Sequence, residues 1–257
     1  MTRKAVYIAA LAAILVAGCA GKNPLRWMAE TIMPVSLGAR VVQLESEDAD
    51  VRREAVLAIA SSNKVESAPA LVRLLCVVAR TDPDTMVRAG AARALGRVEA
   101  EGVVDTLIEV LRADPSAYVR SDAAMALGRQ GAPEGLPALV EAMRNDANTD
   151  VRIAAGGALR HFKDRAAAEA LIAGLEDSNV AQAHKCWESL RYATGQDLPR
   201  EPGPWEAFFA SAEDPFARHG RPPRAPKGKN QRPVLTKTVG QFFKNLFAED
   251  VQKAELE

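Results

Sequence analysis

Few residues in this chain could do acid–base, nucleophilic or metal chemistry. The three histidines, His161, His184 and His219, are scattered along the sequence, and only three cysteines are present. Catalysis needs titratable groups that converge, and the sequence contains no Cys-x-x-Cys, no His-Glu-x-x-His and no phosphate-cradling glycine loop. We therefore expect no catalytic residues, no metal and no cofactor, and a protein that is not an enzyme.

Cys19 is the one cysteine whose position suggests a covalent modification. Two basic residues precede an uncharged apolar run, residues 5–17, and the run ends in Val-Ala-Gly immediately before this cysteine. The run is shorter than the ~20 residues needed to cross a bilayer, and small residues at its end suit a peptidase. Residues 1–19 are therefore predicted to be a signal peptide.

The Val-Ala-Gly-Cys sequence resembles a bacterial lipobox. The resemblance implies cleavage before Cys19 and acylation of its sulfur and amine, with palmitate as one such chain, and several acyl chains anchor a protein stably. Ala20 follows instead of Asp, which in Gram-negative sorting favours the outer membrane over the inner one. We expect a lipid-anchored envelope protein at the outer membrane, facing the periplasm, with residues 20–34 as a tether. The alternative is an ordinary secretory signal with a chance cysteine.

One helical unit recurs through the middle of the chain. The dipeptide Val-Arg starts at positions 51, 87, 119 and 151, and an Asp, Ser or Asn able to cap a helix stands three residues before each valine. An Ala-rich stretch with apolar residues at helical spacing follows each start, and a Leu-rich stretch follows in turn. Gly96 and Gly128 stand where first helices would end. This period predicts an all-α fold, a solenoid of stacked antiparallel helix pairs.

The unit, with an Asp-x-x-Val-Arg opening and an Ala-Ala-x-Ala-Leu-Gly body, resembles HEAT repeats of the short bacterial, phycobilin-lyase-like type. The resemblance covers residues 35–192 and implies a right-handed solenoid, with an incomplete unit at 36–46 and a degenerate one at 177–191. It also implies that the recurrent Asp and Arg residues form a hydrogen-bonded ladder between units, although a binding role for the arginines is the alternative. The ladder arginines are Arg52, Arg88, Arg120 and Arg152.

The two other cysteines, Cys76 and Cys186, are about three repeats apart. Each helix layer adds ~10 Å, so their sulfurs should lie tens of Å apart, whereas a disulfide needs Cα atoms within about 7 Å. We expect no disulfide between them, and Cys76 is predicted to be a small core residue.

Three segments follow the repeats. Residues 193–216 are predicted to cap the array, with Trp205 covering its exposed apolar end. Residues 217–238 carry seven basic residues, no acidic one and four prolines, which predicts an extended, flexible linker. This linker is either a solvated spacer or a site for an anionic envelope polymer such as lipopolysaccharide, acidic lipid or cell-wall polymer. Nucleic acid is not an expected partner of an exported protein.

Residues 239–257 are predicted to form a short amphipathic helix that ends the chain. This helix could pack on the last repeat, dock into a partner's groove or lie on a membrane surface. Its apolar face is centred on Phe242, Phe243, Leu246 and Phe247.

The sequence thus predicts a membrane-anchored scaffold or adaptor that binds a protein partner in the cell envelope. A structural tether that grips anionic polymer through the linker is one alternative, and a phycobilin-lyase-like accessory enzyme is another. The resemblance implies that second helices line the concave face of the array. The partner-binding residues expected on those helices are Arg73, Glu109, Arg112, Glu141 and Arg144.

Overall fold

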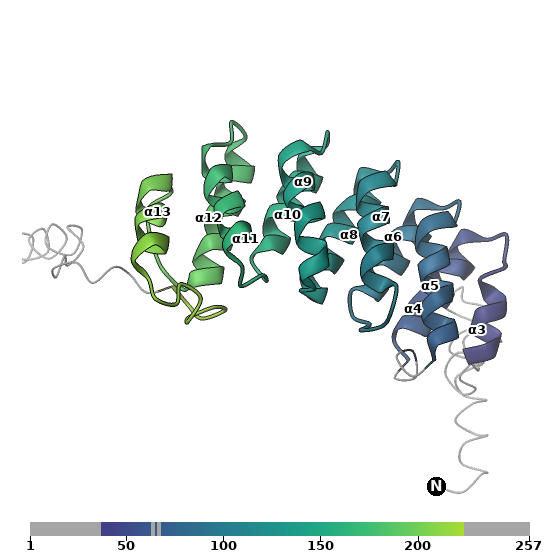
Figure 1. Cartoon of the computed structure of the whole chain (residues 1–257). Coiled ribbons are helices and arrows are strands. Elements are labelled where there is room, and N and C mark those ends of the chain that lie inside the picture. Colours follow the sequence, from purple (N-terminus) through teal and green to yellow (C-terminus); the bar gives the residue numbers. More distant parts are fainter. Residues whose placement is uncertain (1–36, 63–64, 66–67, 224–257) are drawn as a thin grey trace, which may run out of the picture.

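The computed structural model describes residues 37–62, 65 and 68–223, which form a single row of stacked helix pairs (Figure 1). The predicted signal peptide, the tether and the C-terminal amphipathic helix lie outside these residues. None of the helices in the described part of the chain is long and apolar enough to cross a membrane. The α-helices are α3 (Leu37–Gln43), α4 (Ala49–Ala60), α5 (Pro69–Thr81), α6 (Thr85–Leu95), α7 (Val103–Ala113), α8 (Ala117–Gln130), α9 (Leu136–Asn145), α10 (Thr149–Leu159), α11 (Arg165–Ala173), α12 (Val180–Thr194) and α13 (Pro202–Ser211).

The helices form two layers. The first helices of the pairs, α4, α6, α8, α10 and α12, pack against one another in that order and are called the A layer. The second helices, α5, α7, α9 and α11, do the same on the other side and form the B layer, which α3 begins and α13 extends. The all-α solenoid expected from the repeats is confirmed.

Side-chain caps fix where most A-layer helices begin. The Asp84 carboxylate accepts hydrogen bonds from the backbone N–H groups of Met86 and Val87, and Asp48, Asn148 and Asn179 cap their helices in the same way. These bonds satisfy donors that the first turn of a helix would otherwise leave free. Ser116, expected to cap α8, makes no such bond.

Small residues let the A-layer helices approach closely. A Cβ atom on Gly128 would lie 2.8 Å from the Cβ of Ala158, and one on Gly96 would lie 2.8 Å from that of Ala126. The expectation that Gly128 ends a helix is wrong, because α8 continues to Gln130 and ends at Gly131, whose φ is 62°. Gly128 is needed instead for contact between neighbouring units.

The repeat interior is one continuous apolar core. Val87, Ala91 and Leu95 of α6 are fully buried, and the equivalent residues of α8 and α10 are also buried. Burial of each large aliphatic side chain contributes roughly 1.5–3 kcal/mol relative to exposure, so the units stabilise one another through this core. Cys76 and Cys186 are free thiols within it.

The C-terminal end of the array is covered by α13 and the segment after it. The fully buried Trp205 donates its indole N–H to the Pro199 carbonyl oxygen at 2.7 Å. The chain then turns back to α12, where the Gly220 N–H donates to the Tyr192 carbonyl oxygen at 2.9 Å. The first residues of the segment expected to be an extended linker, residues 217–220, thus form turns against the array.

Candidate functional site

The arginines that follow the recurrent valines are held between neighbouring units. Arg88 donates from Nε and Nη2 to the Asp114 carboxylate at 2.7 and 3.1 Å, and from Nη1 to the Asp82 carbonyl oxygen at 2.8 Å. Arg52 bonds to the Asp82 carboxylate and Arg120 to that of Asp146 in the same manner. One chain of bonds therefore runs along the array. Its arginines are engaged within the array, with Arg52 and Arg88 buried and Arg120 and Arg152 partly exposed.

The ladder acceptors are the aspartates at the start of each loop. The aspartates that open the motif, such as Asp84, are occupied as helix caps, so the acceptors stand two residues earlier in the chain, at Asp82, Asp114 and Asp146. The Asp114 carboxylate also accepts the backbone N–H of Ser116. Their repetition at 32-residue intervals in the sequence could have identified them.

The electrostatics agree with charged, tightly bonded rungs. The hydrogen bond to Asp114 raises the pKa of Arg88, and the hydrogen bond from Arg120 lowers the pKa of Asp146. The last ladder contact has a neutral acceptor instead of a carboxylate: Arg152 Nε donates to the Gln182 side-chain oxygen at 2.8 Å. Gln182 is buried, and its Nε2 donates a hydrogen bond to the Met143 carbonyl oxygen.

The B layer carries the charged residues expected to bind a partner, and they are exposed on it. Three of them form ion pairs across units: Glu109 lies 3.0 Å from Arg80, and Arg112 lies 3.4 Å from Glu141. The hollows beside these pairs are small, with volumes of about 260 and 100 Å³. Glu109, Arg112 and Glu141 therefore have partners within the array itself.

The A layer exposes large apolar side chains beside basic ones. Leu57 on α4, Met86 on α6, and Tyr118 and Met125 on α8 are all exposed. Arginines stand among them on the same helices, and Arg93 donates to the hydroxyl oxygen of Tyr118 at 3.2 Å. Exposed apolar side chains gathered on one face indicate a contact surface.

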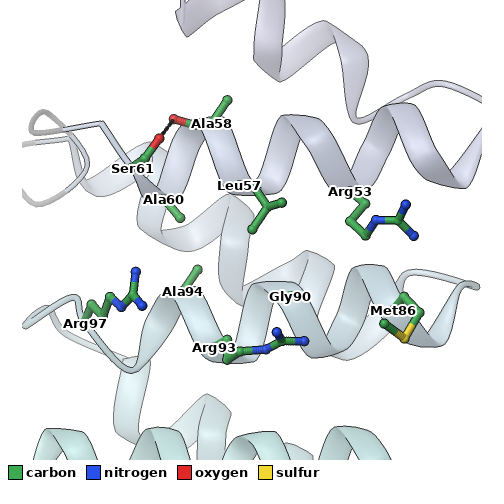
Figure 2. Close-up of a pocket in the computed structure, with 10 residues that line it drawn as sticks. All are labelled: Arg53, Leu57, Ala58, Ala60, Ser61, Met86, Gly90, Arg93, Ala94 and Arg97. Carbon is green, nitrogen blue, oxygen red and sulfur yellow. Dashed lines mark hydrogen bonds between the residues drawn. The ribbon is translucent and has the colours of Figure 1, made fainter.

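A groove of about 560 Å³ lies between α4 and α6. Figure 2 shows Leu57 reaching into the gap between the two helices, above Gly90. Arg53 and Met86 lie at one end of the groove, and Arg97 lies at the other. The groove therefore combines an apolar floor with cationic ends. This face was not predicted from the sequence, although Leu57, Met86 and Met125 fall outside the buried Val, Ala and Leu positions of their helices.

A second groove, of about 620 Å³, lies farther along the same layer, over α8, α10 and the start of α12. Its basic residues include Arg129, Arg160 and Lys185, whereas Asp150 is the only acidic residue that lines it. The remaining lining residues are His161 and the small or apolar Met125, Ile153, Ala154, Gly157 and Ala158.

Positive charge accumulates between the two grooves. Burial lowers the pKa of Arg129 first, and the nearby Arg97 lowers it further, which indicates cations that are incompletely balanced. Arg93 is partly neutralised by the buried Asp122, at 3.0 Å, but burial raises the pKa of that carboxyl group. The A layer is therefore suited to a partner that brings both apolar side chains and negative charge.

Two of the scattered histidines meet in the fold. The ring of His161 lies 5.6 Å from the ring of Tyr192, and His219 lies 5.3 Å from the same ring on another side. Burial lowers the pKa of both imidazoles, so they favour the neutral form. His184 lies apart, near Glu188 and Trp187. Among the described residues no group of three or more potential metal ligands occurs.

A row of stacked helix pairs joined by a polar ladder defines an α-solenoid of the helical-repeat class. The sequence model of the family described as HEAT_2, HEAT repeats, matches residues 38–127 and 104–191, and the chain belongs to this family. It is therefore a helical-repeat scaffold of a kind that commonly mediates protein interactions.

A solved structure similar to this chain is the complex of CpcE and CpcF of phycocyanin lyase from Nostoc sp. PCC7120. The two share 20% sequence identity over 63% of this chain and 77% of that one, with a TM-score of 0.41. The search of curated proteins gives no match. The expectation that the protein is not an enzyme is corrected, because the similar structure is that of a lyase, and we withdraw it. A likeness at this level concerns the fold alone and assigns no lyase activity to this chain.

Proposed function

We propose that the protein is a lipid-anchored scaffold of the cell envelope that binds a protein partner through its A layer. The observation that carries this proposal is the row of exposed apolar side chains over two grooves with cationic edges. Apolar groups in a groove contribute most of the affinity of such surfaces, while surrounding charge speeds association and selects partners. A partner that presents an acidic amphipathic segment fits this chemistry.

The A layer is a better candidate than the B layer because it exposes apolar side chains in larger grooves. Both layers contain ion pairs, and those of the A layer include Arg53–Asp50, Arg93–Asp122 and Lys185–Glu188. Glu109 and Glu141, which sequence analysis placed at the binding surface, each face an arginine of an adjacent unit. A partner that engages these glutamates would first have to replace those ion pairs. Leu57 and Met86 are exposed in the α4–α6 groove, and a partner can contact these apolar side chains without displacing an ion pair.

The docking face is tested by substitutions in the full-length chain followed by crosslinking in cells and mass spectrometry. Leu57→Asp should lower the yield of the recurrent partner at least tenfold, because it places a carboxylate on the groove floor. Glu109→Lys on the B layer is the matched control and should leave the yield unchanged. Circular dichroism should show the same helix content in both variants. Loss with Glu109→Lys alone would place the site on the B layer, and absence of any recurrent envelope protein with the unaltered chain would overturn the proposal.

The anchor is tested separately. Cys19→Ser should abolish incorporation of an alkyne analogue of palmitate and leave residues 1–18 attached to the protein, because both the acylated sulfur and the cleavage site depend on that residue. Fractionation over a sucrose gradient then distinguishes inner from outer membrane. Unchanged labelling of Cys19→Ser would show that the cysteine is not acylated.

A further inference from the structure

The A-layer groove over α8, α10 and α12 lies where the described part of the chain ends. The Gly220 N–H is bonded to Tyr192, and the Tyr192 ring contacts His161, which lines the groove. The groove and the exit of the C-terminal segment are thus joined by direct contacts. The other large groove, between α4 and α6, lies several helices away.

The length of the remaining chain allows a return to this groove. Val239 follows Gly220 by 19 residues, which span up to about 60 Å when extended. Residues 239–257, which the sequence predicts to be helical, would be roughly 28 Å long as a helix at 1.5 Å per residue. This is longer than any A-layer helix, since α12, the longest, has 15 residues. The apolar residues 242–247 span only about 9 Å of it, so this part can lie along the groove.

The chemistry of the two surfaces is complementary. The segment offers four apolar residues at helical spacing, Phe242, Phe243, Leu246 and Phe247, and it carries four acidic residues against two basic ones. The groove offers apolar and small residues such as Met125 and Gly157, and its lining carries Arg129, Arg160 and Lys185 against one aspartate. Lys185 also pairs with Glu188 at 2.6 Å, so Arg129 and Arg160 carry most of the available positive charge. An apolar helical face with negative charge therefore matches an apolar groove with positive charge.

We propose that residues 239–257 of this chain bind in its own α8–α10–α12 groove. The inference rests on the proposed role of the A layer as a docking face, and it assigns one of its two grooves to an internal occupant. The partner then has free access to the α4–α6 groove, and it reaches the second groove only by displacing the tail.

The test uses two matched photo-crosslinking positions in the full-length protein. Met125 lines the proposed groove and is 41% exposed, whereas Met86 lines the α4–α6 groove and is 40% exposed. p-Benzoylphenylalanine is incorporated in place of one or the other, the purified protein is irradiated, and crosslinked peptides are identified by mass spectrometry. We expect position 125 to yield crosslinks to residues 239–257 at least tenfold more often than position 86. The double variant Phe243→Asp/Phe247→Asp should abolish them.

The other outcomes each decide a different question. Equal crosslinking at both positions, or no tail peptide at position 125, would overturn the inference. Mixing isotopically light and heavy protein shows whether the tail belongs to the same molecule; mixed-isotope pairs would identify a second copy as the occupant and overturn binding within one chain. In cells, an envelope protein at position 125 in place of the tail would overturn the inference while supporting the proposed function. Recurrent protein crosslinks at neither position would contradict the proposed function, whether or not the tail is captured.

Discussion

At the scale of single residues, the ladder shows how one side chain serves two units. Asp82 accepts Arg52 through its carboxylate and Arg88 through its carbonyl oxygen, so it links the unit before it to the unit that it opens. The rung between Arg88 and Asp114 is nearly excluded from solvent, with both residues 8% exposed. Removal of one partner from such a pair leaves a buried charge without compensation, which costs much more than the net contribution of the pair.

We therefore expect Arg88→Ala to lower the free energy of unfolding by about 3–5 kcal/mol, measured by urea denaturation. Arg112→Ala is the matched control, because it removes an arginine from an exposed pair between the same kinds of unit. It should lower the free energy of unfolding by at most about 1 kcal/mol. Equal losses would show that the ladder is no more important than a surface ion pair.

The buried thiol of Cys186 is a second residue with a measurable consequence. Burial raises the pKa of this thiol to about 12, from an ordinary value of 9.0, and its sulfur lies 3.8 Å from that of Met143. The unfolded chain loses the proton near pH 9, whereas the folded chain keeps it until about pH 12. The stability from the neutral thiol is therefore complete below pH 9 and declines as pH rises toward 12.

Comparison of the unaltered chain with Cys186→Ala isolates this effect, because other groups titrate equally in both. The free energy of unfolding of the unaltered chain should fall more steeply between pH 9 and 11. Each pH unit contributes up to roughly 1.4 kcal/mol to the difference. Parallel curves would show that the thiol ionises as readily in the folded protein as in the unfolded one.

At the scale of helices, the sequence pattern predicted the elements well and their contacts less well. The recurrent Val-Arg dipeptides and their caps located the A-layer helices, since helical spacing and capping are local properties. Gly128 was wrongly predicted to end a helix. A glycine is needed at this position for close contact with Ala158, some 30 residues away in the next unit. The ladder acceptors and the A-layer grooves also depend on how neighbouring units meet, which local spacing does not encode.

Two glycines of adjacent A-layer helices should respond in opposite ways to alanine. Gly128→Ala puts a methyl group 2.8 Å from the Ala158 Cβ and should cost about 1–3 kcal/mol of stability through overpacking. Gly90→Ala is the control: its Cβ would lie 3.8 Å from Val56, and it should stabilise α6 by roughly 0.5–1 kcal/mol. Thermal unfolding should show a lower stability for Gly128→Ala and a higher stability for Gly90→Ala than for the unaltered chain. Unchanged stability of Gly128→Ala would show that α8 and α10 can separate at little cost.

At the scale of the whole molecule, the two layers have different roles. The B layer pairs charges of neighbouring units beside small hollows, whereas the A layer exposes apolar side chains and basic residues along two larger grooves. The fold class was predictable because repetition multiplies a weak local signal. The proposed docking face was not predictable, because both layers present charged and apolar residues in the sequence and only the folded structure shows which of them line grooves.

The ladder also determines how the length of this protein can change. The first three ladder contacts use an aspartate at the same place before the loop, so these contacts specify how units join and leave their number open. Deletion of residues 83–114 would join Asp82 to Pro115 and recreate the Asp-Pro dipeptide that already begins each of these two loops. Arg52 would then still face Asp82, and Arg120 would take the carbonyl oxygen that Arg88 occupies now. Gain or loss of a whole 32-residue repeat by duplication or recombination would thus preserve the Arg–Asp contacts between neighbouring units. The length of the array can therefore change by one helix pair at a time.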